Sequence, residues 1–460
     1  MVFSSFTFLL LFLPAVVLLY WRMPGRIRMP FLLMASLLFY AWGNPVWLLL
    51  LLYCMVLTWL GAKVMCRVKR RKAVLALLII LDLLPLLWFK YADFFRNTLE
   101  QLTGARIAFD TPLLPAGISF FTFQALSYLL DVYRGDAEAS PGLTVFGVYL
   151  SLFPQLVAGP IVRYTELEAQ LRARPAPQAA EMRAGLRRFI VGLAKKVLLA
   201  DAMGRFWGQM NGDFSAAGWV GAWVGLLAFS FQIFFDFSGY SDMAIGIGHM
   251  LGFTLPENFD RPYRAGSLTE FWRRWHMSLT GWFKTYVYIP LGGSRKGRLR
   301  RDLNVFIVWA LTGLWHGAGW HFVLWGLYFA VLLVLEKRFM PAGRQPGRNA
   351  AGPLRQAVTF LLVMLGWGIF SGFGTELAGA MLGAHGTGSA AALTACAAFS
   401  PMLLLCCAIS FLPTPRREKI PAGLARALPA LRTLGCAALL ALCLAALAAQ
   451  GYAPFVYFQF

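Results

Sequence analysis

Charged residues are scarce in this chain. Of its 460 residues only 14% are Asp, Glu, Lys or Arg, whereas 59% are hydrophobic, and the mean hydropathy is +0.62. Several apolar windows approach or exceed the about 20 residues that an α-helix needs to cross a hydrocarbon core about 30 Å thick. The composition excludes a soluble core and predicts an all-α, polytopic membrane protein.

Acidic residues are especially few, with 21 Asp and Glu against 42 Lys and Arg, and the net charge is +21. A charge of this size raises the question of a nucleic-acid partner. The basic residues, however, fall in short runs between apolar segments, at Arg22–Arg28, Lys63–Lys72, Arg295–Arg301 and Arg416–Lys419. That distribution is the positive-inside pattern of cytoplasmic loops. We therefore expect a phospholipid membrane and no nucleic acid as the partner, with the N-terminus on the outer side.

Metal-site and cofactor motifs are also missing. The seven cysteines form no C-x-x-C pair and no zinc spacing, and they are expected to be small packing residues. The sequence has no H-E-x-x-H motif, P-loop, dinucleotide fingerprint or G-x-S-x-G elbow. No bound metal or cofactor is expected. Met1–Tyr20 is apolar but lacks the basic start and small-residue exit of a cleavable signal, so it is predicted to be a retained first span.

The apolar segments predict about 11–14 membrane helices, several of which are too short to cross alone and are expected to be re-entrant. We expect the apolar segments near Phe3–Trp21, Met29–Trp42, Val46–Val64, Ala73–Phe89, Leu113–Val132, Leu143–Val162, Leu186–Ala202, Trp219–Phe235, Ser238–Phe253, Val305–Trp315, Phe322–Leu335, Val358–Phe370, Ala390–Leu412 and Leu434–Ala449.

The chain shows no fixed-period repeat and no separate soluble domain, so residues 1–460 are expected to form a single membrane domain. Gly43-Asn44-Pro45 predicts a tight turn between two helices. The polar segment 163–188 contains Pro175 and Pro177 and is expected to be a cytoplasmic loop with an amphipathic helix.

Trp315-His316-Gly317 is the segment most indicative of chemistry. It lies in the apolar run Asn304–Leu335, where an ionisable side chain is costly and usually serves a function. The alternative is a histidine that is hydrogen-bonded inside the bundle without a further role. Glycines loosen the backbone around His316 and tryptophans crowd it, which suits a narrow slot beside a broken helix. His321 would lie about 140° around a regular helix from His316, so a zinc pair is disfavoured.

The middle third of the chain contains many polar residues within and between its apolar segments. Asp236 and Tyr240 belong to the stretch Phe235–Asp242, which is predicted either to shape a cavity floor or to be a capped break between two helices. Asn258 follows in the next polar stretch and is expected to line the same cavity.

The next stretch, Phe271–Leu279, has two alternative interpretations. Arg273, Arg274 and His276, flanked by Trp272 and Trp275, could belong to a helix that lies among lipid head groups. They could instead face the phosphates or the thioester of an acyl donor.

Beyond that stretch, Tyr286–Gly293 is predicted to be extended because Pro290 breaks a helix. Tyr288 is expected to contact substrate. With the metal, cofactor and nucleophile motifs absent, the remaining candidate for catalysis is an imidazole base. A neutral histidine can take a hydroxyl proton as that hydroxyl attacks an activated acyl group.

Two motifs in order carry a family resemblance. Phe271–Gly293 reads FWRRWHMSLTGWFKTYVYIPLGG and Leu311–Gly326 reads LTGLWHGAGWHFVLWG. Together they resemble the membrane-bound O-acyltransferase (MBOAT) family, and most closely its bacterial alginate O-acetyltransferase-like branch. Further matches occur at Leu114–Asp131, Phe153–Ile161 and Pro454–Phe460. The resemblance covers essentially the whole chain.

The resemblance implies a ring of tilted helices around a central funnel, with residues 236–330 as catalytic core. It places the catalytic histidine at His316 and the second functional histidine at His276, with Trp272 and Trp315 beside them. It implies a multi-pass protein of the bacterial inner membrane that takes acetyl groups from acetyl-CoA or an acyl-carrier thioester. A separate periplasmic SGNH-like acyltransferase would then place them on an extracytoplasmic polysaccharide.

The chain departs from the branch at two places. Relatives often carry W-G-x-x-H-G where this chain has Trp325–Ala330, and F-F-R where it has Ile369–Ser371. Neither departure touches the histidine pair, and both leave the acceptor polymer open. Two other functions remain as alternatives: a transporter of an acyl lipid or polysaccharide precursor, and a scaffold that recruits a periplasmic acyltransferase.

Overall fold

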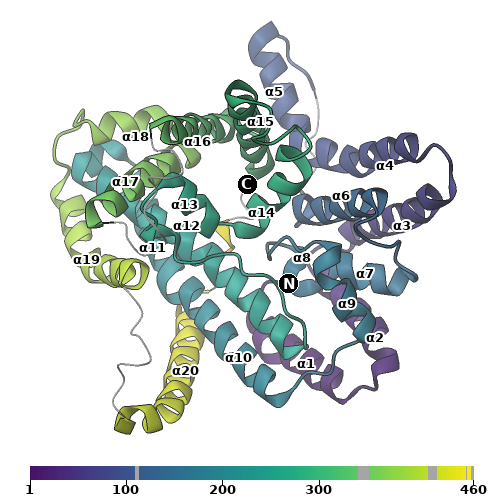
Figure 1. Ribbon diagram of the computed structural model, residues 1–460. Coiled ribbons are helices and arrows are strands. Elements are labelled where there is room, and N and C mark those ends of the chain that lie inside the picture. Colours follow the sequence, from purple (N-terminus) through teal and green to yellow (C-terminus); the bar gives the residue numbers. More distant parts are fainter. Residues whose placement is uncertain (109–112, 340–351, 413–421, 452, 457–460) are drawn as a thin grey trace.

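The computed structural model describes residues 1–460 except 109–112, 340–351, 413–421, 452 and 457–460, and it also leaves aside the side chains of 422–427 and 450. Within the described residues every regular element is a helix (Figure 1). The basic run Arg416–Lys419 and the last four residues of the chain lie outside the described part.

The N-terminal half is a series of helices that ends with a long one. Its elements are η1 (Thr7–Phe12), α1 (Leu13–Arg22), α2 (Gly25–Ala41), α3 (Pro45–Arg67), α4 (Arg71–Leu86), η2 (Leu87–Tyr91), α5 (Ala92–Thr103), α6 (Ile118–Arg134), α7 (Leu143–Ser151), α8 (Phe153–Leu156), α9 (Tyr164–Ala173), α10 (Ala179–Ala194), η3 (Lys195–Ala200), α11 (Asp201–Asn211) and α12 (Phe214–Met250).

The C-terminal half begins with short pieces and continues with longer helices. Its elements are η4 (Pro262–Arg264), α13 (Leu268–Arg274), α14 (Met277–Phe283), η5 (Lys284–Tyr288), α15 (Arg298–His316), α16 (Trp320–Phe339), α17 (Pro353–Phe370), α18 (Gly374–Met381), α19 (Ala390–Phe411) and α20 (Ala422–Gln450).

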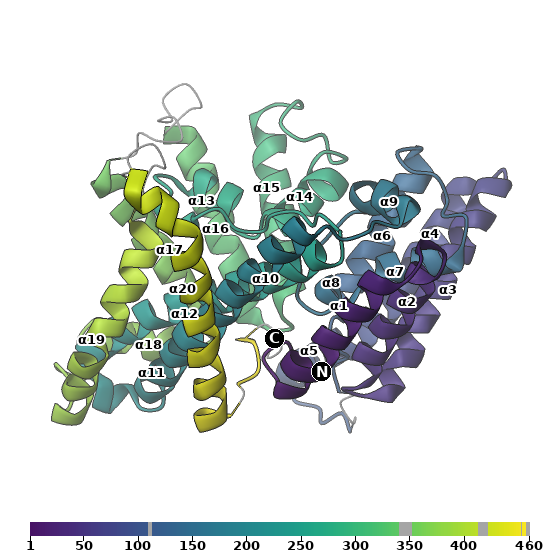
Figure 2. The same cartoon turned by 90° about the horizontal axis from the view of Figure 1, so that it is seen from below.

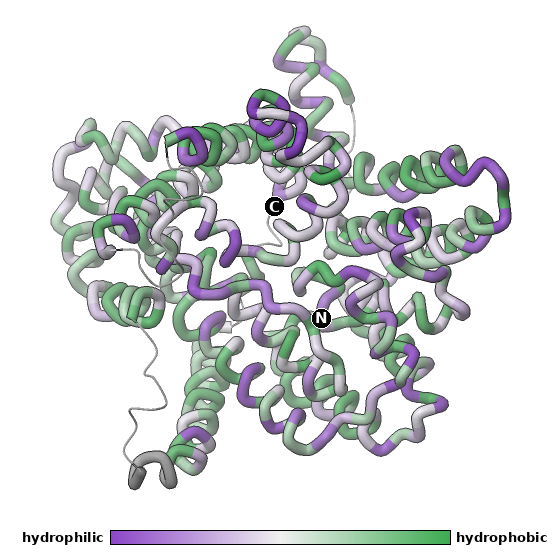
Figure 3. The backbone as a smooth tube through the Cα atoms, viewed as in Figure 1, coloured by the Kyte–Doolittle hydropathy of each residue, from purple (hydrophilic) through white to green (hydrophobic). Residues whose placement is uncertain are grey.

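In the part of the chain that the structure describes, six helical stretches are long and apolar enough to cross a membrane: Pro45–Arg67, Arg71–Thr103, Phe214–Met250, Pro353–Phe370, Ala390–Phe411 and Leu428–Ala449. Shorter helices lie between them. Viewed from the side, the helices are tilted, with α9 at one face and α5 at the opposite face (Figure 2). Hydrophobic residues follow the outlying helices α3 and α4, whereas their connection is hydrophilic (Figure 3). The prediction of an all-α, multi-pass membrane protein is confirmed.

Two clusters of buried apolar side chains form the interior. One joins the N-terminal helices and includes Tyr240 and Trp315, and the other joins α11, α13 and α16–α19 and includes Phe235 and Trp275. Helix α12 contributes to both clusters. The segment that carries the two histidine motifs therefore lies at the border between them.

The expected break between Phe235 and Asp242 is absent. The predicted spans Trp219–Phe235 and Ser238–Phe253 form one helix, α12, whose only non-helical residue is Gly218 at φ +61°. The break prediction was wrong because the polar side chains find partners on other elements. Asp236 pairs with Lys196 at 2.8 Å, and Asp242 pairs with Lys195 at 2.6 Å, so neither is needed to cap a helix end.

Two further local predictions can be compared with the structure. Asn44 accepts a hydrogen bond from the Val46 amide at the start of α3, which confirms the turn at Gly43–Pro45. The segment Tyr286–Gly293 is not extended: it begins in the π-helical turn η5 and continues in turns. Asn304 of α15 holds it there by donating to the carbonyls of Leu291 and Gly293.

Candidate active site

His316 is the last residue of α15, and its side chain is fixed by its own helix. The ring Nδ1 lies 2.7 Å from the carbonyl oxygen of Thr312, one turn earlier. A carbonyl only accepts hydrogen bonds, so Nδ1 carries the proton and Nε2 carries the lone pair. The imidazole is 6% exposed. It is thus held as the neutral tautomer that can accept a proton at Nε2.

The backbone around His316 turns sharply because glycines allow close packing. Gly317 leaves the helix in an extended conformation, with φ −164°. A Cβ on Gly313 would meet the carbonyl of Phe322 on the following helix, α16. The Gly–Trp alternation of the sequence therefore corresponds to a helix that ends at the histidine and a chain that returns directly beside it.

The end of α15 is held by two side chains from the junction of α4 and α5. The Lys90 ammonium donates to the carbonyls of Trp315 at 2.6 Å and His316 at 3.2 Å. The Tyr91 hydroxyl donates to the carbonyl of Leu314 at 2.6 Å. These carbonyls have no partner within the helix, and a cation is favourable at the negative end of a helix dipole.

His276 sits between two short helices instead of on one. Its backbone is left-handed, with φ +45°, and separates α13 from α14. A non-glycine residue in this conformation persists only where its surroundings hold it. On the N-terminal side, Ser267 caps α13, and Glu336 of α16 accepts from the amides of Leu268 and Thr269. Hence α13 is fixed to the same helix that packs against α15.

A side-chain network orients the His276 ring. The amide N–H and hydroxyl of Ser278 both donate to Asn258 Oδ1, at 3.2 and 2.9 Å. Because an amide N–H can only donate, this atom of Asn258 is its oxygen, and His276 Nδ1, 3.2 Å away, must be a donor to it. Asn258 Nδ2 in turn donates to Ser241 of α12. His276 therefore also has its lone pair on Nε2.

The two imidazoles lie side by side at the border between the two buried clusters. Their centroids are 6.3 Å apart with planes at 85°. Trp315 contacts both rings, at 5.8 Å from His276 and 5.0 Å from His316. Phe237 covers His276 on one side, and Trp325 covers His316 on another. The pair is therefore enclosed by aromatic side chains.

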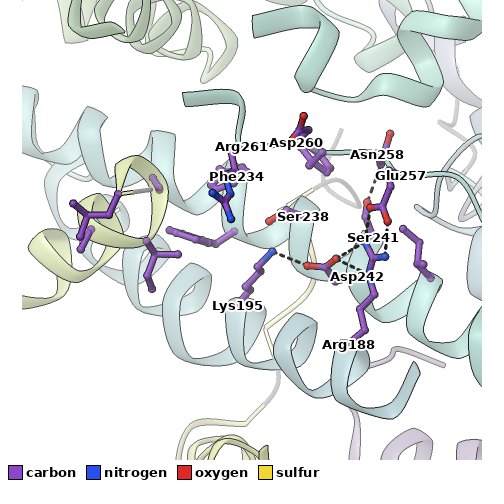
Figure 4. A pocket seen from close by; sticks show the side chains of 17 residues that line it. Arg188, Lys195, Phe234, Ser238, Ser241, Asp242, Glu257, Asn258, Asp260 and Arg261 are labelled. Atoms are coloured by element: carbon purple, nitrogen blue, oxygen red, sulfur yellow. Dashed lines mark hydrogen bonds and ion pairs between the residues drawn. The ribbon is translucent and has the colours of Figure 1, made fainter. Parts of the chain in front are cut away.

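A cavity of about 490 Å³, the large cavity, reaches the His276 network through Asn258 and Ser241. It opens among the second half of α10, α12 and the segment after it, and the end of α19. Charged side chains crowd its wall, with Lys195 and Arg188 both contacting Asp242, and Glu257 on the other side of Arg188 (Figure 4). Polar and charged groups thus line the approach to His276.

A second cavity of about 150 Å³, the small cavity, reaches His316 itself. It is lined by Lys90, Trp315, Val157 and the residues from Leu114 to Phe120 at the start of α6. Lys90 lies in η2, which directly precedes α5, and α5 lies at the face opposite α9 (Figure 2). The two cavities share no lining residue, so the histidine pair stands between two separate spaces.

The structure brings some of the predicted site residues together and not others. Asn258, His276, Trp315 and His316 form one group. Trp272 is one step away, packed at 4.5 Å against Trp309 and 4.9 Å against Phe329.

The other predicted residues lie outside both cavities. Asp236 is buried against Lys196, and Tyr240 stacks on Phe3 at 4.7 Å. Arg273 is exposed, Arg274 pairs with Glu270 at 2.6 Å, and Tyr288 follows α14 in η5.

Lys90 is the residue at the site that sequence reasoning missed. It lies just after the predicted apolar segment Ala73–Phe89, within the helical stretch Arg71–Thr103. The rule that an ionisable residue in a membrane helix marks a functional site applies to it as it does to His316. It also lies in a π-helical turn, a feature that is frequent at functional sites.

Comparison with known proteins agrees with the sequence resemblance. A family model described as MBOAT, membrane-bound O-acyltransferase family, matches residues 38–373. The chain is 37% identical to a Pseudomonas putida protein named "Probable alginate O-acetylase AlgI", over the full length of both chains. It is 40% identical to a protein of the same name from Pseudomonas aeruginosa, over 80% of this chain and 72% of that one.

A more distant relative has a different polymer in its name. The chain is 33% identical to "Peptidoglycan O-acetyltransferase" from Helicobacter pylori, over 80% of this chain and 77% of that protein. With a family model that covers most of the chain and two histidine motifs that meet in space, the chain belongs to the membrane-bound O-acyltransferase family and is an O-acyltransferase.

Proposed function

We propose that this protein moves acetyl groups from a cytoplasmic thioester donor, acetyl-CoA or an acyl-carrier thioester, across the bacterial inner membrane for O-acetylation of an extracytoplasmic polysaccharide. The observation that carries the proposal is the pair of neutral imidazoles, 6.3 Å apart, between two cavities that share no residue. A thioester approaching from one side and a hydroxyl from the other would meet there.

The orientation rests on the basic residues. Arg22 and Arg67 end helices, and Arg71 and Arg298 begin them, so the basic runs occupy the connections expected in the cytoplasm. With those connections inside, the N-terminus is periplasmic. We assign the large cavity, which Arg188, Lys195 and Arg261 line, to the cytoplasmic side, because its cations suit the phosphates of a donor. The small cavity faces the periplasm.

His316 acts as the general base in this proposal. Its Nε2 takes the proton of the acceptor hydroxyl as the hydroxyl oxygen attacks the carbonyl carbon of the thioester. The tetrahedral intermediate then collapses, the carbon–sulfur bond breaks, and the thiolate leaves with the proton from the imidazolium. His276 orients the thioester, since its ring is fixed by Asn258 and lies 6.3 Å from that of His316.

The acceptor belongs to the polysaccharide class. Relatives named for alginate and peptidoglycan acetylation support such a polymer without choosing between them. The small cavity, at about 150 Å³, is far too small for a polysaccharide chain. This supports transfer first to a smaller hydroxyl carrier or to a periplasmic SGNH-like acyltransferase, which then modifies the polymer.

The test is a His316→Ala variant expressed at wild-type abundance in a strain that lacks the chromosomal copy. Mild base releases ester-linked acetate from the isolated polysaccharide, and this acetate is measured. We expect a loss of at least about 10²-fold, the scale of general-base catalysis. The matched control is Thr312→Val, which removes a hydroxyl one turn away but keeps the carbonyl that holds the ring. Unchanged acetate in His316→Ala would contradict the proposal, as a transporter or scaffold would give that result.

A further inference from the structure

The small cavity contains a buried cation whose presence the proposed base does not explain. Lys90 is 9% exposed and lines the cavity together with His316. Among the described residues no carboxylate lies within ion-pair distance of its ammonium. Burying a cation without a counter-charge inside a membrane protein is costly. Neutral hydroxyl groups, such as that of Tyr91, could donate to the carbonyls at the end of α15 without this cost.

The third contact of Lys90, with Ser119, indicates a function for the charge. Besides the two carbonyls of α15, its ammonium donates to the hydroxyl oxygen of Ser119 at 3.3 Å. An ammonium group only donates, so Ser119 accepts and its own O–H is directed elsewhere. Ser119 stands in the first turn of α6 and lines the small cavity. A hydroxyl polarised by a cation is thus available to an oxygen atom that enters the cavity.

The start of α6, which forms another part of the cavity wall, also favours a negatively charged group. Residues 117–120 of the first turn of α6 line the cavity, and a helix N-terminus favours negative charge. His316 lines the same cavity. A volume of about 150 Å³ equals that of about five water molecules in the liquid, which is enough for an acetyl group and the end of an alcohol.

We propose that Ser119 is a catalytic residue that stabilises the oxyanion of the transfer reaction, holding the acyl oxygen in the small cavity beside His316, and that Lys90 is the positioning residue that polarises Ser119. This inference rests on the proposed function. When the acceptor hydroxyl attacks the thioester carbon and gives its proton to His316, the carbonyl π electrons move to oxygen. Ser119 donates to that oxygen, and Lys90 stabilises its charge through Ser119. On collapse the electrons return, the carbon–sulfur bond breaks and the thiolate takes the proton from His316.

The test compares four variants in the same complemented strain: Lys90→Met, Lys90→Arg, Ser119→Ala and Tyr91→Phe. The initial rate of incorporation of radiolabelled acetate into base-labile polysaccharide esters is measured at equal membrane abundance. Removing one oxyanion donor costs about 10²–10³-fold in rate. We therefore expect that loss for Ser119→Ala, which removes the donor itself, about 10-fold for Lys90→Met, and at least partial recovery in Lys90→Arg, which keeps the charge.

Tyr91→Phe is the matched control because Tyr91 also donates to a carbonyl at the end of α15 but does not line the small cavity. We expect it to keep most of the wild-type rate. The double variant Lys90→Met/Ser119→Ala should be no slower than Ser119→Ala alone, since Lys90 acts through Ser119 and residues that act as a unit are not additive. Thermal unfolding in detergent reports whether each variant is folded, and Ser119→Ala, the smaller change, still decides the question if Lys90→Met fails to insert.

Two outcomes would overturn the inference. If Lys90→Met and Tyr91→Phe lose the same activity in parallel with the same loss of thermal stability, and Ser119→Ala is unaffected, Lys90 only closes the helix. If both Lys90→Met and Ser119→Ala label polysaccharide at the wild-type rate, neither residue is catalytic. His316→Ala separates this from failure of the proposed function: an inactive His316→Ala with an active Lys90→Met rejects the oxyanion role alone.

Discussion

The two histidines of the site are held by different kinds of structure. His316 is oriented by a carbonyl of its own helix, four residues away. His276 has a left-handed backbone between two short helices and is oriented by Asn258, 18 residues away. The first arrangement is local and forms with α15, whereas the second requires α12, the segment after it and α14 to be assembled. We conclude that the proposed base is held within one helix, whereas the histidine proposed to orient the donor depends on the assembled fold.

The largest effect on activity is expected when His276, the histidine proposed to orient the donor, is replaced. We expect His276→Ala to lower the rate of polysaccharide acetylation by at least about 10²-fold, because a thioester misplaced by about 1 Å can cost that much. His249→Ala is the control, because His249 lies at the end of α12 outside both cavities, and it should retain the wild-type rate. A His276→Ala enzyme at full rate would leave His316 as the sole functional histidine of the pair.

The second prediction addresses the support of His276. Asn258→Ala removes the oxygen that accepts from Ser278 and faces His276 Nδ1. We expect a fall in kcat of up to about 10²-fold, because a misplacement of about 1 Å can cost that much. The change should appear in kcat more than in KM for the donor, as measured with purified protein in lipid nanodiscs and acetyl-CoA or an acetylated carrier. If only KM changes, Asn258 serves the large cavity and not the histidine.

The third prediction concerns packing on the two sides. Gly313→Ala would place a methyl group against the carbonyl of Phe322, and we expect it to destabilise the fold by about 1–3 kcal/mol. Gly281→Ala in α14 meets no atom within 4 Å and should be neutral or stabilise by up to about 1 kcal/mol. Denaturant unfolding in detergent distinguishes the two. Equal effects would mean that the His316 side is no more tightly packed than the His276 side.

The smallest effect is expected at the charged wall of the large cavity. Asp242 pairs with Arg188 at 2.9 Å and Lys195 at 2.6 Å, and all three side chains are partly exposed. Exposed pairs contribute about 0–1 kcal/mol each and weaken in salt. Asp242→Asn should therefore lower stability only slightly, and by less at about 1 M salt than at low salt. A loss of several kcal/mol that ignores salt would show that these pairs are structural.

The sequence predicts the part of this molecule that is local. Apolar runs identified most helices, and the Gly–Trp context of His316 indicated a broken helix, because both depend on neighbours in the chain. The sequence did not predict that α12 runs unbroken through Asp236, since that depends on Lys196, 40 positions earlier. Lys90 was missed for the same reason: its partners are 225 and 226 residues away.

The prediction of donor-binding residues was limited in the same way, because it used only neighbours in the chain. Arg273 and Arg274 were singled out because they are adjacent to His276 in the chain. In the structure the cations of the large cavity are Arg188, Lys195 and Arg261, from segments that the periodicity did not connect. The local sequence motif identified His276 but not the charged residues that line the large cavity.

The separation of the two cavities has a consequence for the cell. An inner membrane that stores a proton-motive force tolerates a continuous water-filled channel only at the expense of ion leakage. Here His276 packs against Trp315 and Phe237, and the three side chains are 1%, 4% and 1% exposed. We expect vesicles that contain this protein to remain impermeable to protons and small ions, so that turnover delivers an acyl group outward without discharging the membrane.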